Sequence, residues 1–159
     1  MPPTPLTPTV RYIPPGTRKV YWVTTIATYT SPTRAELNAG IDLSAEVAAV
    51  TGFTVTSATT PTPDLSSRFT SEIPAAITAA SCSLSIYATS TSSDVRTVLP
   101  RGTIGYVVML WEGDVTGQRM DIFPATVTTS AVNGNMTAAE LVDVSFSITK
   151  VPANNVLIP

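Results

Sequence analysis

Carboxylates, hydroxyls and one thiol are the side chains of this sequence that could do chemistry, and they form no catalytic pattern. The chain has no histidine and a single cysteine, Cys82. Without histidine the commonest general base is absent, and neither a Ser-His-Asp nor a Cys-His arrangement can form. One cysteine without histidine also excludes a typical zinc site. The residue types therefore predict a protein that is not an enzyme and needs no cofactor or metal.

Two pairs of carboxylates lie close together in the sequence. Asp42 and Glu46 are four residues apart, which on a short helix is typical of a solvated face. Glu112 and Asp114 flank Gly113 in an ordinary hairpin-turn composition, and no carbonyl-rich loop supports a cation site there. The glycines match neither a dinucleotide-binding motif nor a phosphate-binding loop. No pair predicts a site for small-molecule chemistry.

The composition favours a subunit of an assembly. Charged residues make up 13% of the 159 residues, against about a quarter in an ordinary soluble protein. Serine and threonine take their place, and a hydroxyl-rich surface costs little to desolvate against a partner. The net charge of −2 lacks the basic stripe that specific nucleic-acid binding needs.

Charge is unevenly spread along the chain. The first 34 residues carry four basic and no acidic side chains, whereas the rest carry five basic and eleven acidic ones. This asymmetry suits head-to-tail contact between copies, although chance placement of solvated charges is the simpler explanation from charge alone.

The sequence shows no signal for export or for a membrane. No basic segment followed by an apolar run opens the chain, and no apolar run approaches the ~20 residues of a membrane span. We therefore expect a protein made in a cytoplasm. Cys82 alternates with Leu84 and Ile86, which predicts a buried structural thiol.

Alternating and β-branched segments predict six strands and an antiparallel sandwich or barrel. The strand over 104–112 is apolar on both faces, so neither face should meet water. Pro124 should interrupt its strand at an edge or a bulge, because proline lacks the amide donor. The predicted strands cover 18–30, 53–60, 82–89, 104–112, 118–132 and 141–151.

Two or three short helices accompany these strands. Thr33 and Glu36 have the spacing of a capping box, which predicts a helix or turn over 31–40. Ser44 precedes an Ala/Val run and predicts a second helix over 41–52. A further helical turn is expected within 92–102, stopped by Pro100.

A single domain accommodates these elements. We expect an extended, proline-rich arm over 1–17, a β domain over 18–151 and a tail over 152–159. A long inter-strand loop over 58–81 contains the stretch TTPTPDLSSRFTSEIP. Its prolines stiffen it, and no base or nucleophile accompanies its charged residues, so an ordered contact element is a better interpretation than slack or an active site.

Several stretches together resemble the major tail tube proteins of tailed bacteriophages, of the siphophage type that infects actinobacteria. The most specific are PTRAELNAG, TPDLSSRFTSEIP and DVRTVLPRG, and the resemblance runs from about Tyr21 to the end of the chain. The N-terminal arm is not part of it.

This resemblance implies a fold and a function. Six subunits would form a ring whose strands join in a continuous inner β-barrel, and stacked rings would make a hollow tube. The tube would enclose the tape-measure protein, meet tail terminator and distal tail proteins at its ends, and conduct DNA non-specifically into the host. It would be part of the virion, assembled in the bacterial cytoplasm. The strand over 104–112 would meet its own core on one face and a neighbour on the other.

Long loops and terminal arms make the contacts between subunits in this family. By resemblance, contacts between copies are expected from the loop and the arm, and the polar face of the last strand is a candidate lining of the channel. The loop residues are Asp64, Arg68, Phe69 and Glu72; the arm residues are Arg11, Tyr12 and Arg18; the channel candidates are Asp143, Ser145, Ser147 and Thr149.

Two other functions stay open. The chain could be the inner-tube subunit of a phage-derived contractile injection system or tailocin, which only its gene neighbourhood would distinguish. An immunoglobulin-like binding module should be a soluble monomer and would usually carry a secretion signal, which this sequence lacks.

Overall fold

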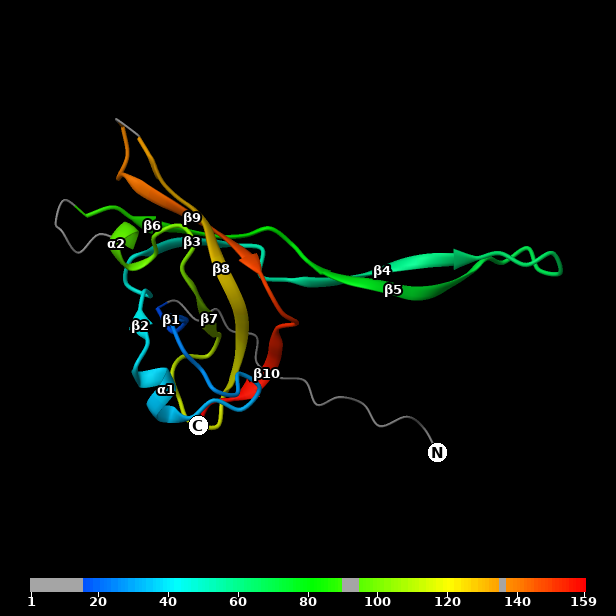
Figure 1. The fold of residues 1–159 in the computed structure, drawn as a ribbon, viewed down its shortest axis with the longest axis horizontal. Coiled ribbons are helices and arrows are strands. Elements are labelled where there is room, and N and C mark those ends of the chain that lie inside the picture. Colours follow the sequence, from blue (N-terminus) through cyan, green and yellow to red (C-terminus); the bar gives the residue numbers. More distant parts are fainter. Residues whose placement is uncertain (1–15, 90–94, 135–136) are drawn as a thin grey trace.

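The computed structural model describes residues 16–89, 95–134 and 137–159. These residues form mainly antiparallel β structure with two short helices, so the predicted fold class is confirmed. One sheet has the order β2-β1-β7-β8-β9-β6-β3, with β10 paired to β8, and β4 and β5 form a separate two-stranded sheet (Figure 1). The elements are β1 (Lys19–Val23), α1 (Arg34–Asn38), β2 (Ile41–Asp42), β3 (Val47–Thr51), β4 (Val55–Thr62), β5 (Ser71–Ala79), β6 (Cys82–Tyr87), α2 (Val95–Val98), β7 (Ile104–Leu110), β8 (Arg119–Asn133), β9 (Leu141–Ile148) and β10 (Ala153–Leu157).

Two hydrophobic clusters lie on opposite faces of β7. Val107 and Met109 belong to the larger cluster, which also contains Trp22 and Phe146. Val108 and Leu110 belong to a second cluster formed with residues of α1, β8 and the C-terminal segment. Both faces of the strand are therefore dry from Val107 to Leu110, as predicted, whereas Ile104 at its start is 70% exposed. The expectation that a neighbouring subunit covers one face is wrong, because the chain covers both faces itself.

The capping box of the first helix is confirmed. The Thr33 Oγ1 accepts a hydrogen bond from the Glu36 backbone N at 3.3 Å, and the Glu36 Oε2 accepts one from the Thr33 backbone N at 2.7 Å. The second carboxylate oxygen of Glu36 accepts from the Ala27 backbone N at 2.7 Å, so the cap also fixes the incoming loop. These hydrogen bonds hold the pKa of Glu36 below its ordinary value.

The helix predicted over 41–52 is wrong. β2 and β3 occupy this segment, and the Ser44 hydroxyl accepts a hydrogen bond from the Val20 backbone N at 2.9 Å instead of capping a helix. The Ala/Val run pairs with β6, placing Val47 opposite Ile86 and Val50 opposite Leu84. Tertiary strand pairing overrides the helix propensity of alanine here. The helical turn expected within 92–102 is present as α2.

The strand predicted over 18–30 ends early, and the one predicted near Pro124 is unbroken. β1 stops at Val23, after which the chain turns and packs Ile26 into the second cluster. Pro124 pairs with Tyr106, and its carbonyl accepts a hydrogen bond from the Thr149 backbone N at 2.9 Å. On this side of β8, Pro124 lies between the residues that pair with β9 and those that pair with β10. The N–H that proline lacks therefore removes no hydrogen bond between paired strands. The bulge lies further along, between Val127 and Thr129.

Two segments predicted to lack regular structure are strands. The loop expected over 58–81 is largely the hairpin β4–β5, and the expected tail over 152–159 contains β10, followed by the buried Ile158. Pro61 and Pro74 suggested a connector, but they lie in a two-stranded ribbon whose outer edges are free, where proline is tolerated.

Gly105 offers a test of packing between β7 and β1. A Cβ at this position would lie 2.6 Å from Trp22 Cζ2 and 2.8 Å from the Val23 carbonyl oxygen. We expect Gly105→Ala to lower the free energy of unfolding by about 1–3 kcal/mol through overpacking, measured by urea denaturation of the unassembled chain. Gly134→Ala is the control, because a Cβ there meets nothing within 4 Å. Equal urea midpoints for the two variants would contradict the packing.

Candidate functional site

One face of the sheet is lined by hydroxyl side chains over four strands. Along β3, β6, β9 and β8, the buried side chains point to one side and the polar ones to the other. We call the polar side the hydroxyl face. Its polar members include Thr51, Ser83, Ser85, Thr129, Asn133, Asp143, Ser145 and Ser147, and Ala49, Tyr87, Ala131 and Leu141 lie on the same side.

Asp143 is the one charged member of the hydroxyl face. Its carboxylate accepts a hydrogen bond from the Ser85 Oγ at 2.6 Å and one from the Asn133 Nδ2 at 3.4 Å. These bonds hold the charge close to the sheet instead of leaving it on a mobile side chain. The face therefore offers hydroxyls and a fixed negative charge to whatever lies opposite it.

Three of the four predicted channel residues share the hydroxyl face. Asp143, Ser145 and Ser147 lie on β9 with their side chains away from the core. Thr149 lies just beyond the end of β9, where its backbone N and its Oγ1 donate to the Pro124 carbonyl. Its hydroxyl closes the junction between β8 and β9.

Among the residues that the structure describes, the four-strand section that carries this face ends in two free edges. β3 has a sheet partner, β6, on one side only. β8 pairs with β7 no further than Thr126, so its residues 128–133 pair with β9 alone. Unpaired rows of N–H and C=O groups are templates for another strand. Val50 and Val132 lie on the core side of these edges and are 42% and 36% exposed.

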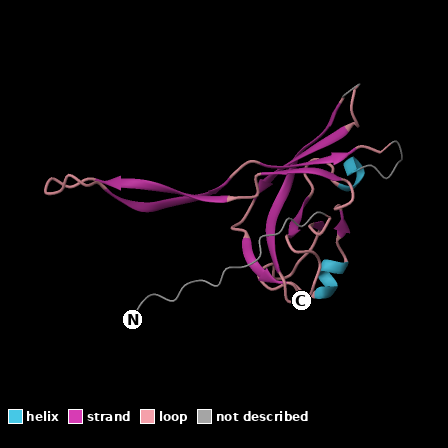
Figure 2. Ribbon diagram, turned by 180° about the vertical axis from the view of Figure 1, so that it is seen from behind, coloured by secondary structure: helices cyan, strands magenta, loops and turns pink. Residues whose placement is uncertain are grey.

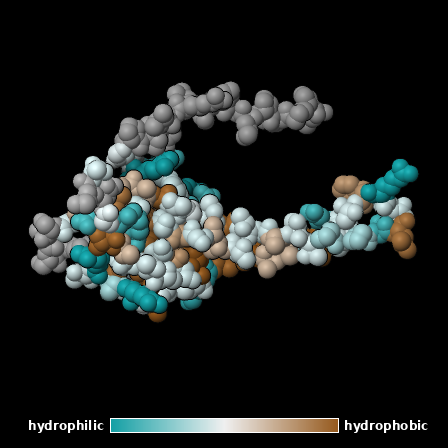
Figure 3. Space-filling view, turned by 90° about the horizontal axis from the view of Figure 1, so that it is seen from above, coloured by the Kyte–Doolittle hydropathy of each residue, from teal (hydrophilic) through white to brown (hydrophobic). Residues whose placement is uncertain are grey.

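The hairpin β4–β5 projects from the body (Figures 1 and 2). Every residue from 56 to 81 is exposed. Apolar side chains are nevertheless frequent on it: Ile73 and Ile77 are 53% and 60% exposed, Phe69 77%, and Leu65 is fully exposed. Figure 3 shows hydrophobic residues gathered at the far end of the hairpin beside hydrophilic ones. An isolated two-stranded ribbon is marginally stable in water, and exposed apolar side chains of this kind mark candidate contact surfaces.

The predicted loop residues all lie on this hairpin. Asp64 Oδ1 accepts hydrogen bonds from the Ser66 N at 2.8 Å and the Ser66 Oγ at 2.6 Å, which lower the pKa of Asp64. Asp64 therefore organises the turn. Arg68 and Phe69 are exposed beside it, and Glu72 lies on β5 opposite Pro61.

The arm residues give a different result. Arg18 lies over the Trp111 ring of its own domain, with the guanidinium carbon 5.4 Å from the ring centroid. Arg11 and Tyr12 lie outside the described residues.

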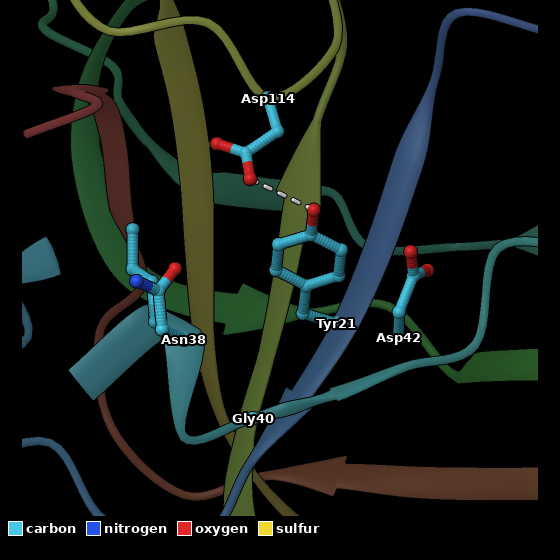
Figure 4. A pocket seen from close by; sticks show the side chains of 6 residues that line it. Tyr21, Asn38, Gly40, Asp42 and Asp114 are labelled. Atoms are coloured by element: carbon cyan, nitrogen blue, oxygen red, sulfur yellow. Dashed lines mark hydrogen bonds between the residues drawn. The ribbon is translucent and has the colours of Figure 1, made fainter. Parts of the chain in front are cut away.

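A polar pocket lies beside β1, β2 and α1 (Figure 4). Both of its carboxylates have hydrogen-bond partners within the chain. Tyr21 Oη donates to Asp114 Oδ2 at 2.9 Å, and Arg34 binds both oxygens of Asp114, at 2.5 and 2.7 Å. Asp42 accepts from Ser44 and from Lys19. No local pattern indicates the Arg34–Asp114 pair, because 80 residues separate the partners.

These contacts shift the pKa values of Tyr21 and Asp114. Burial, followed by the hydrogen bond to Asp114, raises the pKa of Tyr21 to about 12. The hydrogen bond from Arg34 lowers the pKa of Asp114. The network ties α1 to the β7–β8 turn, so the pocket is structural.

Other sites for chemistry are not found in the part of the chain that the structure describes. It contains no group of three or more residues that could hold a metal ion, and neither of its helices is long and apolar enough to cross a membrane. Cys82 is buried, as predicted, and its sulfur accepts a hydrogen bond from the Phe53 backbone N at 3.2 Å. Burial raises the pKa of this thiol.

A comparison with protein families decides among the interpretations of a polar sheet face, free edges and a projecting hairpin. The sequence model of a phage tail tube protein family matches residues 6–159. The chain belongs to this family. It is a structural subunit of a viral tail, which assembles with copies of itself into the tube and associates with other tail components. Membership of a structural family favours a non-enzymatic role. No curated protein matches the chain.

The Arg34–Asp114 pair predicts an acid-sensitive contribution to stability. The pKa of Asp114 is below its ordinary value of 3.8 in the folded chain, so its contribution is complete above the unfolded pKa and is lost as the pH falls through the lower, folded value. We expect Asp114→Asn to lower stability at neutral pH and to flatten the loss of stability at acid pH. Urea midpoints across pH measure this, with Glu72→Gln on the exposed hairpin as the control. An unchanged pH profile in Asp114→Asn would contradict the role of the pair.

Proposed function

We propose that six copies of this chain form a ring with a continuous inner β-barrel, and that stacked rings make a tube that encloses the tape-measure protein and conducts DNA. The number six, the tape-measure protein and the tail terminator and distal tail proteins as end partners come from the family resemblance of the sequence. The same resemblance favours a siphophage of actinobacteria, a place in the virion tail and assembly in the bacterial cytoplasm.

The two free edges are the observation that carries this proposal. β3, β6, β9 and β8 alternate in direction, so β3 and residues 128–133 of β8 run in opposite directions. In a ring, each copy therefore presents a β8 edge that is antiparallel to the β3 edge of the next copy. Closing the sheet through such pairs removes every free edge of the barrel. The exposed Val50 and Val132 would then lie at each junction and continue the core across it.

The hydroxyl face is the proposed lining of the channel. The other face of the same strands is occupied by the chain's own core, so only the hydroxyl face is available to a lumen. DNA carries one negative charge per about 1.7 Å of its axis. A lining of hydroxyls and Asp143 carboxylates offers no cation to hold phosphates, so DNA can slide past it.

The hairpin supplies the proposed contact between subunits. Asp64 shapes the tip, Arg68 and Phe69 are its exposed contact residues, and Glu72 lies behind them on β5. Arginine and aromatic side chains are enriched where interfaces concentrate their binding energy. Arg11, Tyr12 and Arg18 are proposed as contacts of the arm. A contractile injection device would use the same tube, and the gene neighbourhood distinguishes it from a phage tail.

Electron microscopy of the purified chain tests the assembly. Tubes or six-fold rings are expected. A chain that stays monomeric at high concentration, even with a tail initiator complex present, would contradict the proposal.

Lysine in place of the edge valine tests the junction between copies. Val50→Lys places a charge where the core should continue into the next copy, so we expect the yield of rings to fall roughly tenfold or more while the monomer stays folded. Val115→Lys is a matched control, because Val115 is 54% exposed in the β7–β8 turn. Size-exclusion chromatography and electron microscopy measure the outcome. Equal assembly of the two variants would rule out β3 as a junction.

Charge reversal on the hydroxyl face tests the channel. Asp143→Lys would put a ring of cations in the lumen, and we expect tubes to form while DNA ejection slows, because lysine binds phosphate. The slowing should weaken as salt rises, and Asp143→Asn should eject DNA faster than Asp143→Lys. Ejection followed by dye fluorescence from phages that carry each variant measures the rates. Wild-type ejection by Asp143→Lys particles would show that Asp143 does not face the DNA.

A further inference from the structure

The tip of the hairpin is an ordered apolar projection. The hydrogen bonds from Ser66 to Asp64, and one from the Phe69 backbone N to the Ser67 Oγ at 3.0 Å, fix the turn between β4 and β5. Leu65 and Phe69 are exposed on this turn, and Arg68 lies between β4 and β5 beside them. Because the turn is already ordered, a partner that binds it pays less conformational entropy.

A small apolar pocket lies at the other end of the molecule. It is formed by β2, the turn between β2 and β3, the end of β6 and α2, and its volume is about 150 Å³. A cavity of about this size, lined by aliphatic side chains, accommodates a benzene ring. Ile41 and Tyr87 are 42% and 43% exposed at its mouth, and Ile86 and Val95 are buried at its base.

The rim of the pocket carries an available carboxylate. Glu46 is exposed, and its carboxylate makes no hydrogen bond or ion pair with the residues that the structure describes. Asp42, the other acidic lining residue, is held by Ser44 and Lys19. The guanidinium of Arg68 likewise has no partner among the described residues. Arg68 at the tip and Glu46 at the rim are therefore opposite charges that are each available for a pair, while the acidic Asp64 of the tip is held by Ser66 and Glu72 lies further back on β5.

Tip and pocket lie at opposite ends of one ribbon of strands. The β3–β6 ladder has the pair Val47–Ile86 beside the pocket and the pair Thr51–Ser83 beside the base of the hairpin. Figure 1 shows β2, α2 and the end of β6 on one side of the body and the hairpin projecting from the other. A tip therefore cannot reach the pocket of its own chain, whereas it can reach that of a second copy placed beyond it. Such head-to-tail contacts repeat without limit along a line.

We propose that the hairpin tip of each copy inserts Phe69 into this pocket of a copy in the next ring, with Arg68 paired to Glu46. The inference rests on the proposed tube, in which barrel strands run at a tilt along the axis and so aim the hairpin at the adjacent ring. It assigns Phe69 as the anchor, Arg68 and Glu46 as the residues that fix orientation, and the β2–β6–α2 pocket as the receptor.

A charge swap tests this contact in the full-length chain. Arg68→Glu and Glu46→Arg, each alone, should shorten tubes and lower polymer yield roughly tenfold or more, while single rings still form. The double variant Glu46→Arg/Arg68→Glu should recover tube length. The control Arg68→Glu/Glu72→Arg has the same net charge but leaves Glu46 opposite a glutamate, and it should not recover. Tube length by electron microscopy and sedimentation measures all four variants.

Each outcome separates the contact from the tube itself. Recovery by the first double variant but not by the second supports the contact. Rings that stack normally in both single variants, or recovery by both double variants, would overturn it and leave the proposed tube intact. Failure of the unaltered chain to form rings or tubes would overturn both.

Cross-linking gives a second measurement. A chain carrying Leu65→Cys and Tyr87→Cys should form a covalent ladder of many copies when tubes are oxidised, because Leu65 is exposed on the tip beside Phe69 and each copy then links to the next in both directions. Chains with one of these substitutions should stay monomeric on a denaturing gel, since Cys82 is buried. A ladder missing from intact tubes of the double-cysteine chain would overturn the contact.

Discussion

At the edge of an antiparallel sheet, the backbone N–H and C=O groups of the last strand have no strand partner. The rest of this structure depends on that constraint. β3 and residues 128–133 of β8 are the two ends of a four-strand section, and within the described part of the chain each has one strand partner. Many proteins blunt such edges with charges or cover them. This chain instead places the exposed Val50 and Val132 at the edges, which favours pairing with a further copy.

The rest of the fold holds this section in place. β7 is buried on both faces by the chain's own clusters, so the body is packed before any assembly takes place. The Arg34–Asp114 pair ties α1 to the turn that precedes β8, and Thr149 closes the β9 end against Pro124. The hydroxyl face and the hairpin are thus attached to a body whose core is packed within the single chain.

Local pattern in the sequence was sufficient for some features. Alternation predicted β9 and its polar face, and the spacing of Thr33 and Glu36 predicted α1 with its cap. Features that depend on distant residues could not be predicted in this way. The Ala/Val run of β3 is a strand because β6 lies beside it, and Asp114 binds Arg34 across 80 residues. The prolines of the hairpin suggested a loop, because proline is tolerated only at the edges of a sheet. Nothing in the local sequence shows that both strands of this hairpin are edge strands. The pocket behind Tyr87 combines residues of β2, β6, α2 and the connections beside them, so no single stretch of sequence indicates it.

A cryo-electron microscopy reconstruction of the assembled tube tests the central claim most directly. It should show β3 of one copy paired antiparallel with residues 128–133 of β8 in the next, with the hydroxyl face toward the lumen. A reconstruction in which these two edges stay unpaired, or in which the hydroxyl face lies on the outer surface, would contradict the account.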